Sequence, residues 1–126
     1  MLVLDSGGLS RLAARTKTSV SLIRALTAQE LWPPLVPTMV LVESLYGDAG
    51  RDANTHRFPK TCIIESTVRV DVARRAAELR RLARGGSAVD ALVVAIAEPG
   101  GTIITGDRAD IEALAAHADG VSVEVI

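Results

Sequence analysis

The fold is decided by residues 2–9, whose sequence is LVLDSGGL. The apolar residues Leu2–Leu4 predict a short β-strand, which ends at Asp5 and the small residues that follow it. Leucine and alanine then recur at helical spacing from Leu9 to Arg15, and this pattern predicts a short amphipathic helix. A strand that leads directly into a helix is the opening unit of an alternating α/β fold.

The alternation continues along the chain. Apolar or β-branched segments predict further strands at Leu35–Pro37, Thr61–Ser66, Thr102–Thr105 and Val121–Val125. Helical periodicity and capping residues predict helices at Val20–Glu30, Met39–Tyr46, Val68–Arg84, Ser87–Glu98 and Arg108–Ala118. We therefore expect an α/β protein, a three-layer α/β/α fold with a mainly parallel central sheet, in which residues 1–126 form a single domain.

Composition excludes several functional classes. The chain has 14 Lys and Arg against 15 Asp and Glu, and this near-neutral balance argues against a general binder of polyanions. Its three aromatic residues are too few for a surface that stacks nucleic-acid bases. The single cysteine cannot form an internal disulfide, and no apolar segment approaches the ~20 residues of a membrane-spanning helix. A cytoplasmic protein without membrane contact is therefore expected.

Four acidic residues follow or interrupt the predicted elements near one edge of the sheet. They are Asp5, Glu43, Asp90 and Asp107. Each has a structural interpretation, because Asp5 suits a turn, Asp107 suits a helix N-cap, and Ser87 with Asp90 suits a capping box. Glu43 is harder to explain in this way, since it interrupts an apolar helical run.

Taken together, the four acids favour a cation site. Carboxylates that meet at one sheet edge repel one another by roughly 1 to 4 kcal/mol per close pair unless a cation or proton intervenes. Oxygen ligands without His or Cys select Mg²⁺ or Mn²⁺, and such ions support phosphoryl transfer. Asp110, one helical turn after Asp107, is a fifth candidate ligand or a helix-dipole charge. Without these five acids, the remaining chain has 10 acidic and 14 basic residues, so overall neutrality does not exclude RNA.

The acids lie within four segments: Leu2–Ser10, Val36–Gly47, Ser87–Ala97 and Ile103–Asp110. In this order and at these spacings, the segments resemble the PIN-domain ribonucleases, and in particular the VapC toxins of bacterial toxin–antitoxin pairs. The resemblance implies a Mg²⁺- or Mn²⁺-dependent endoribonuclease that acts as the toxin of a type II system. It also implies a homodimer that a small VapB-like antitoxin holds inactive, and the positive mean hydropathy of +0.29 agrees with apolar surface covered by another chain.

The resemblance assigns the family's catalytic acidic quartet to Asp5, Glu43, Asp90 and Asp107. Asp5, Asp90 and Asp107 are the expected metal ligands, with Glu43 and Asp110 as further candidates. Ser6 and Thr105 match the polar neighbours of the family's site. Gly106 and the second acid at Asp110 leave open whether Asp107 or Asp110 fills the fourth role.

Arginines are the candidates for binding RNA phosphates. Arg11, Arg15 and Arg108 lie near the predicted site in the sequence. Six more arginines lie between Arg69 and Arg84, where they form either a solvated or partner-binding helix face or a track for the RNA backbone.

Two other functions compete with this interpretation. An aspartyl-phosphate receiver or a phosphatase of the haloacid dehalogenase type is disfavoured, because Gly7 occupies the position of the second aspartate and the only lysines are Lys17 and Lys60. The other alternative is a catalytically inert PIN-like module that only binds a partner. Retention of all four acids disfavours it.

Overall fold

The computed structural model describes residues 1–126 and confirms the predicted fold class. The elements in chain order are β1 (Leu2–Leu4), α1 (Ser6–Ala13), α2 (Lys17–Ala28), β2 (Leu35–Pro37), α3 (Thr38–Ser44), α4 (Ala53–Arg57), the 3₁₀ helix η1 (Phe58–Thr61), β3 (Ile63–Glu65), α5 (Val70–Ala83), α6 (Ala88–Ala97), β4 (Thr102–Thr105), α7 (Arg108–Ala115) and β5 (Ser122–Val125). All strand pairs are parallel, in the order β3-β2-β1-β4-β5.

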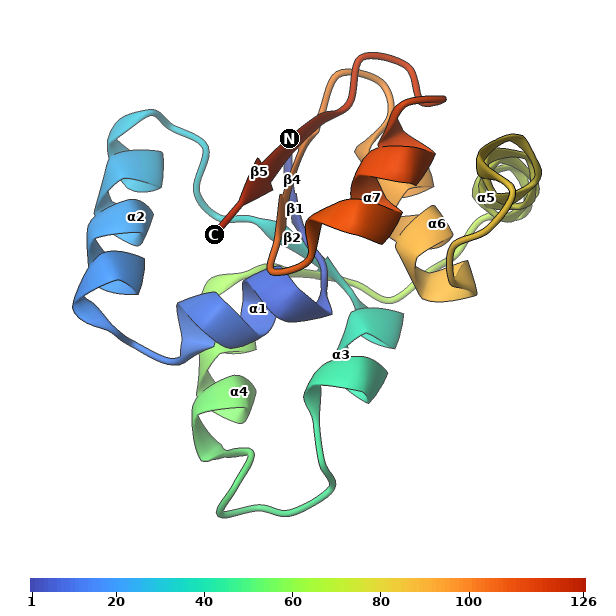
Figure 1. The fold of residues 1–126 in the computed structure, drawn as a ribbon. Coiled ribbons are helices and arrows are strands. Elements are labelled where there is room, and N and C mark those ends of the chain that lie inside the picture. The colour runs from blue at the N-terminus through green and yellow to red at the C-terminus, as the bar shows by residue number, and fades with distance from the viewer.

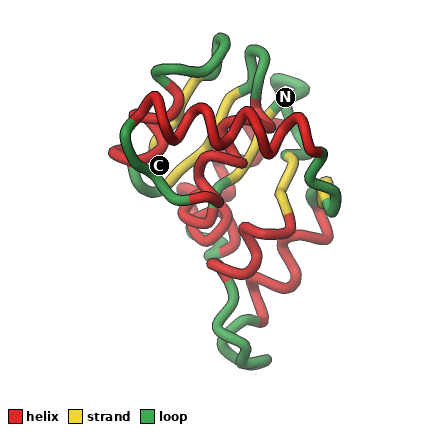
Figure 2. Tube along the Cα trace, turned by 90° about the vertical axis from the view of Figure 1, so that its right-hand side faces the viewer, coloured by secondary structure: helices red, strands yellow, loops and turns green.

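The sheet lies between two layers of helices. Helices α5, α6 and α7 lie on one side of it and α1 and α2 on the other, as Figure 1 shows. A view along the other direction shows α5 as the outermost helix of its layer, extended across the front (Figure 2). The apolar core fills the space between the layers, and Val3, Val36 and Ile103 of the central strands are fully buried. None of the helices combines the length and the apolarity needed to cross a membrane.

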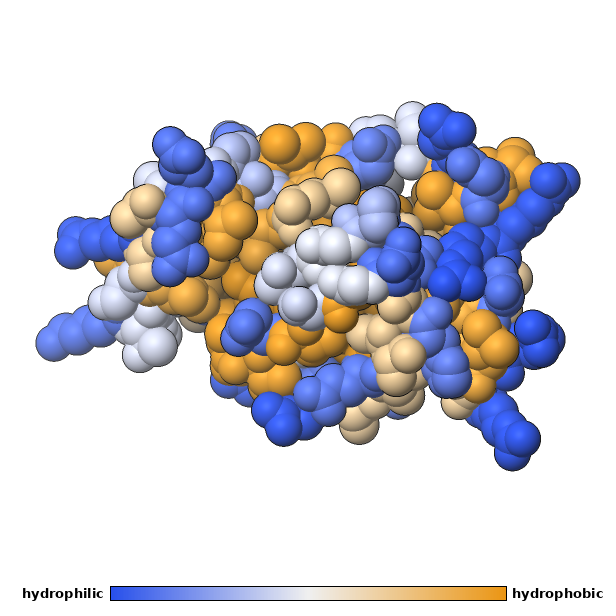
Figure 3. All heavy atoms as spheres, turned by 90° about the horizontal axis from the view of Figure 1, so that it is seen from above, coloured by the Kyte–Doolittle hydropathy of each residue, from blue (hydrophilic) through white to orange (hydrophobic).

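The strand register brings the ends of β1 and β4 side by side. Leu4 pairs with Ile104, so the next residues along the two strands, Asp5 and Thr105, are neighbours. Helices α1, α3 and α7 begin at this carboxyl edge (Figure 1). The opposite face of the molecule, seen from above in Figure 3, exposes apolar side chains in its middle and hydrophilic side chains at both ends.

Helices α1 and α2 each begin three residues before their predicted starts, and the early start of α1 has a clear physical reason. Helix α1 begins at Ser6 and not at Leu9, so Gly7 and Gly8 lie inside its first turn. A Cβ at Gly8 would lie 2.1 Å from the Ile104 carbonyl oxygen, so only glycine allows α1 to approach β4 this closely. Helix α5 ends at Ala83, one residue before its predicted end, and Arg84 caps it in the left-handed conformation with φ 56°, although Gly85 follows.

Candidate functional site

A polar cavity of about 400 Å³ lies at the carboxyl edge of the sheet. It is lined by Asp5, Ser6, Gly7, Ser10, Arg11, Glu43, Asp90, Gly106, Asp107, Asp110 and Ile111. The five predicted acids therefore line a single cavity, although they belong to or adjoin four separate elements, β1, α3, α6 and α7. We call this feature the acidic cavity.

Asp5 is the most deeply placed of these acids, with 5% of its surface exposed. One carboxylate oxygen accepts the Gly8 N–H at 2.7 Å, which caps α1, and the other accepts the hydroxyl of Thr105. The Thr105 hydroxyl also accepts the Asp107 N–H at 3.0 Å, so it connects the end of β1 to the start of α7. Burial raises the pKa of the Asp5 carboxyl, the charge of Glu43 raises it further, and the hydrogen bonds oppose the shift.

Asp90 lies in the first turn of α6 and is half-buried. Its N–H donates to the Ser87 hydroxyl at 3.0 Å, so the predicted cap at Ser87 is confirmed. Burial raises the pKa of the Asp90 carboxyl, and the negative charges of Glu43, Asp5 and Asp110 raise it further. The charge of Glu43 therefore raises the pKa of both Asp5 and Asp90 in the acidic cavity.

The other three acids lie at the exposed mouth of the acidic cavity. Asp107 caps α7, because its carboxylate accepts the Ala109 N–H at 3.2 Å. It thus fulfils its structural interpretation while it also lines the cavity. Asp110 lies in the first turn of the same helix, and Glu43 lies near the end of α3. Asp107 and Asp110 both border the acidic cavity.

The donor set of the acidic cavity fits a hard divalent cation. Every candidate ligand is an oxygen, and Mg²⁺ prefers oxygen ligands and keeps several of its waters, so one or two carboxylates can suffice. No three Asp, Glu, His or Cys side chains are grouped closely enough to enclose an ion by themselves. A bound cation would therefore contact some of these acids through water.

The predicted polar and basic residues separate into two groups. Ser6 and Arg11 line the acidic cavity, and Thr105 is buried against Asp5. Arg15 lines a different cavity, on the other side of α1. Arg108 is exposed and forms an ion pair with Glu112 at 3.4 Å, one helical turn along α7. Only Arg11 of the three arginines predicted to bind RNA therefore borders the acids.

The sequence analysis missed two glycines that shape the acidic cavity. A Cβ at Gly7 would lie 2.7 Å from the Gly106 nitrogen, and a Cβ at Gly106 would lie 3.1 Å from the Arg11 Nε atom. These two segments therefore cross in close contact at the cavity wall. The signal available in the sequence was a glycine within two residues of an acid after each of two strands, but their contact depends on the strand register.

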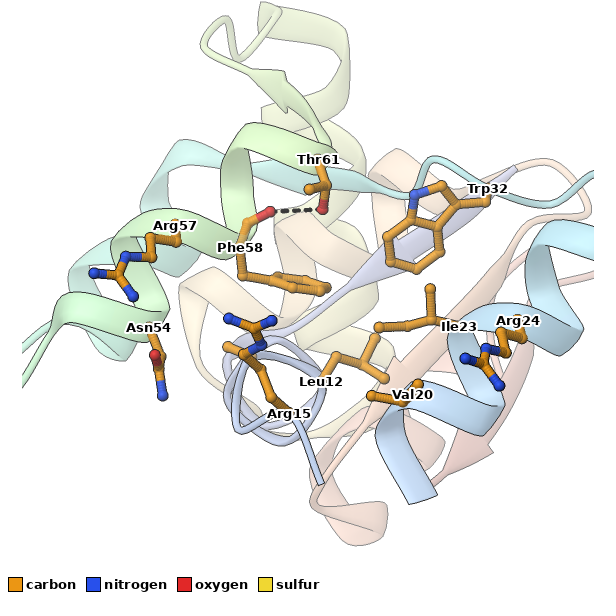
Figure 4. A pocket seen from close by; sticks show the side chains of 11 residues that line it. Leu12, Arg15, Val20, Ile23, Arg24, Trp32, Asn54, Arg57, Phe58 and Thr61 are labelled. Atoms are coloured by element: carbon orange, nitrogen blue, oxygen red, sulfur yellow. Dashed lines mark hydrogen bonds between the residues drawn. The ribbon is translucent and has the colours of Figure 1, made fainter. Parts of the chain in front are cut away.

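A second cavity of about 520 Å³ lies between α1, α2, α4 and the segment before β2. Figure 4 shows apolar side chains turned toward its interior, with arginines around them. Its lining comprises Leu12, Ala13, Arg15, Val20, Ile23, Arg24, Trp32, Asn54, Arg57, Phe58 and Thr61. The rings of Trp32 and Phe58 meet edge to face at 5.9 Å. We call this feature the apolar cavity.

No protein-family model matches the chain, and a search of curated proteins finds no significant match. The assignment of function therefore rests on the residues of these cavities.

Proposed function

We propose that this protein is a divalent-cation-dependent endoribonuclease of the PIN-domain type, acting as the cytoplasmic toxin of a toxin–antitoxin pair. The observation that carries the proposal is the acidic cavity, where five acids from four elements meet. A fold gains no stability from a half-buried group of like charges, since burial and repulsion both disfavour the charged forms. Such a group is explained when a cation and an anionic substrate occupy the cavity.

Asp5 and Asp90 are the residues that we assign as principal ligands of the cation. They lie deepest, and their raised pKa values reflect a site that favours added positive charge. A divalent cation bound there supplies a polarised water and neutralises charge on the phosphodiester. The Gly8 N–H and the Thr105 hydroxyl fix both oxygens of the Asp5 carboxylate, so its orientation is set before any ligand binds.

The mouth of the acidic cavity suits an RNA backbone. None of the three aromatic residues lines the cavity, so bases have no ring on which to stack there. Arg11 has no carboxylate partner within ion-pair distance, so its guanidinium is available to bind a phosphate. Arg11 and the cation would hold the phosphodiester from two sides.

Cleavage of a mixed RNA pool tests the proposal. We expect cleavage with Mg²⁺ or Mn²⁺ and none in EDTA, and we expect Asp5→Asn and Asp90→Asn to reduce the rate at least about 100-fold. Glu98→Gln is the matched control, because Glu98 lies at the other end of α6 from Asp90. Equal cleavage in EDTA or by Asp5→Asn would contradict the proposal, and absence of cleavage by the wild type would favour the inert module.

The proposal includes a small antitoxin, to which we assign the apolar cavity. Five large apolar side chains line it, and Arg15, Arg24 and Arg57 surround them. This combination favours an amphipathic, acidic segment of a partner protein. Expression of this chain should arrest growth, co-expression of a small protein from a neighbouring gene should relieve the arrest, and Ile23→Glu should prevent the relief without loss of RNA cleavage. Relief that is unaffected by Ile23→Glu would contradict this assignment.

A second copy of this chain is the other partner in the proposal, which includes a homodimer. Large apolar side chains remain exposed in the single chain, among them Val42 at 80% and Val70 at 65%. Sedimentation of the purified protein should give the mass of two chains, and Val42→Asp tests whether α3 contributes to the interface. The mass of one chain at all concentrations would contradict the dimer.

A further inference from the structure

The exposed face of α5 carries a stripe of arginines that no other side chain neutralises. Arg74, Arg81 and Arg84 are exposed, and their spacing places them within about a quarter turn of one another on the helix. We call these three residues the arginine stripe. It extends for about 15 Å along the helix, the length of roughly four stacked nucleotides.

The other arginines of this segment already have partners. Arg69 pairs with Asp71 at 3.0 Å, and Arg75 pairs with Glu98 at 2.8 Å and with Glu78 at 3.2 Å. The two acidic residues of α5, Asp71 and Glu78, are engaged in these pairs, so no ion pair includes a residue of the arginine stripe.

Arg80 also has a partner, because its guanidinium donates to the Gly86 carbonyl at 3.0 Å. No such bond exists for Arg74, Arg81 or Arg84, so their donors face solvent. Figure 3 shows hydrophilic side chains that project from the α5 side of the molecule, at right.

Arg84 adopts a conformation that glycine would adopt more easily. Its φ of 56° ends α5 in the left-handed region, where a side chain adds strain, and Gly85 and Gly86 follow immediately. A glycine at residue 84 would end the helix without strain. Arg15 and Glu30 adopt the same conformation after α1 and α2, so the position of Arg84 in line with Arg74 and Arg81, and not its strain, carries the argument.

The arginine stripe leads toward the acidic cavity. Residues 84–87 connect the end of α5 to the start of α6, and Ser87 caps the turn of α6 that carries Asp90. Figure 1 shows this connection at the same edge of the sheet as the starts of α1 and α3, and Figure 2 shows α5 extended away from it.

We propose that Arg74, Arg81 and Arg84 bind phosphates along an RNA strand and direct it into the acidic cavity. This inference rests on the proposed ribonuclease function, for which it names the path of the substrate. Positive charge, exposure and a linear arrangement favour a polyanion, because contacts to phosphates require no preformed cavity and no aromatic ring. The arginines are positioning residues and do not take part in bond cleavage.

Binding of a mixed-sequence single-stranded RNA in EDTA tests the arginine stripe without cleavage. The variant Arg74→Gln/Arg81→Gln/Arg84→Gln should bind about 10- to 100-fold more weakly than the wild type at low salt. Its plot of log affinity against log salt concentration should be shallower by about 2, since each phosphate contact contributes about 0.7 for single strands. The control Arg69→Gln should match the wild type, because Arg69 is paired with Asp71.

Cleavage kinetics separate this inference from the proposed function. In Mg²⁺, the triple variant should show a higher KM with an unchanged kcat, whereas Asp5→Asn should lose kcat. Unchanged RNA affinity and salt dependence in the triple variant would overturn the arginine stripe even if the wild type cleaves RNA. A change in oligomeric state with unchanged RNA affinity would also overturn it, and would assign α5 to a protein interface. Absence of cleavage by the wild type would contradict the ribonuclease proposal alone.

The variant Arg84→Gly gives a second readout. Relief of the left-handed strain should raise the melting temperature by roughly 2–4 °C, while loss of the guanidinium should weaken RNA binding. A higher melting temperature with unchanged RNA affinity would show that Arg84 does not bind RNA.

Discussion

Helix α6 has an acidic residue at each end, and the two have opposite surroundings. Asp90, in its first turn, faces the carboxylates of the acidic cavity, which together with burial raise its pKa. Glu98, just after its last turn, accepts two hydrogen bonds from the Arg75 guanidinium at 2.8 and 2.9 Å and one from the Asp119 N–H. Hydrogen bonds from Arg75 lower the pKa of the Glu98 carboxyl. A carboxylate with matched donors stabilises the fold, whereas one surrounded by like charges destabilises it unless a cation or proton intervenes.

Asp52 supports the same distinction. Its carboxylate accepts the backbone N–H groups of Tyr46, Gly47 and Asp48 at 2.8 to 3.1 Å, and the Tyr46 bond contributes most to its lowered pKa. Only 1% of the residue is exposed, because the loop that it organises surrounds it. Asp52 is therefore a structural acid, like Glu98.

The largest effect is expected where the acidic cavity is assembled. Gly8→Ala places a methyl group against the Ile104 carbonyl oxygen, and either α1 or β4 must shift. We expect a loss of about 3 kcal/mol in the free energy of unfolding, measured by urea denaturation. Gly85→Ala is the control, since no atom lies within 4 Å of the added Cβ, and it should change stability by less than about 0.5 kcal/mol. Similar losses in the two variants would contradict the close contact between α1 and β4.

The next largest loss of stability is expected at Glu98, just after the last turn of α6. Glu98→Gln should destabilise the protein by about 2 kcal/mol at neutral pH, because the charge-assisted pair with Arg75 is lost. The folded-state pKa of Glu98 is lowered, so its contribution is present above its unfolded pKa and is lost as the pH falls through the folded-state value. Thermal unfolding should therefore show a smaller loss of stability in acid for Glu98→Gln than for the wild type. If the stabilities of the wild type and Glu98→Gln fell in parallel as the pH decreased, the charge of Glu98 would not stabilise the fold.

The smallest predicted change in the free energy of unfolding is an increase, and it is expected at Asp90. Asp90→Asn should stabilise the protein by about 1 kcal/mol in EDTA at neutral pH, because it removes a charge that burial and neighbouring acids disfavour. The folded-state pKa of Asp90 is raised, so its penalty is absent below its unfolded pKa and is complete above the folded-state value. The stability gain should therefore disappear as the pH falls, in a thermal melting series. A loss of stability at neutral pH would contradict the repulsion inferred for the acidic cavity.

Much of the fold could be predicted from the sequence because local patterns and global topology agree. The strand Thr102–Thr105 and the cap at Ser87 are as predicted. The start of α1 could not be predicted, because Gly7 and Gly8 are poor helix formers and their use depends on the backbone of β4. The end of α5 was predicted to within one residue, but sequence preference does not indicate an arginine in the left-handed region.

The site was partly predictable for a similar reason. The edge where Asp5, Glu43, Asp90 and Asp107 meet follows from strand order and helix starts, which the alternating pattern contains. The structural acids Asp52 and Glu98 were not distinguished, because their donors are distant in the sequence or belong to the backbone. Arg15 was predicted near the acids, but it lies past the end of α1 and borders the apolar cavity.

The central claim is that the acids of the acidic cavity form a site for a divalent cation. Calorimetric titration of the protein with Mn²⁺ tests it most directly, with Asp5→Asn/Asp90→Asn as the test variant and Glu98→Gln as the control. We predict saturable binding by the wild type and by Glu98→Gln, and at least about tenfold weaker binding by the double variant. Absence of binding by the wild type, or equal affinity in the double variant, would contradict the claim.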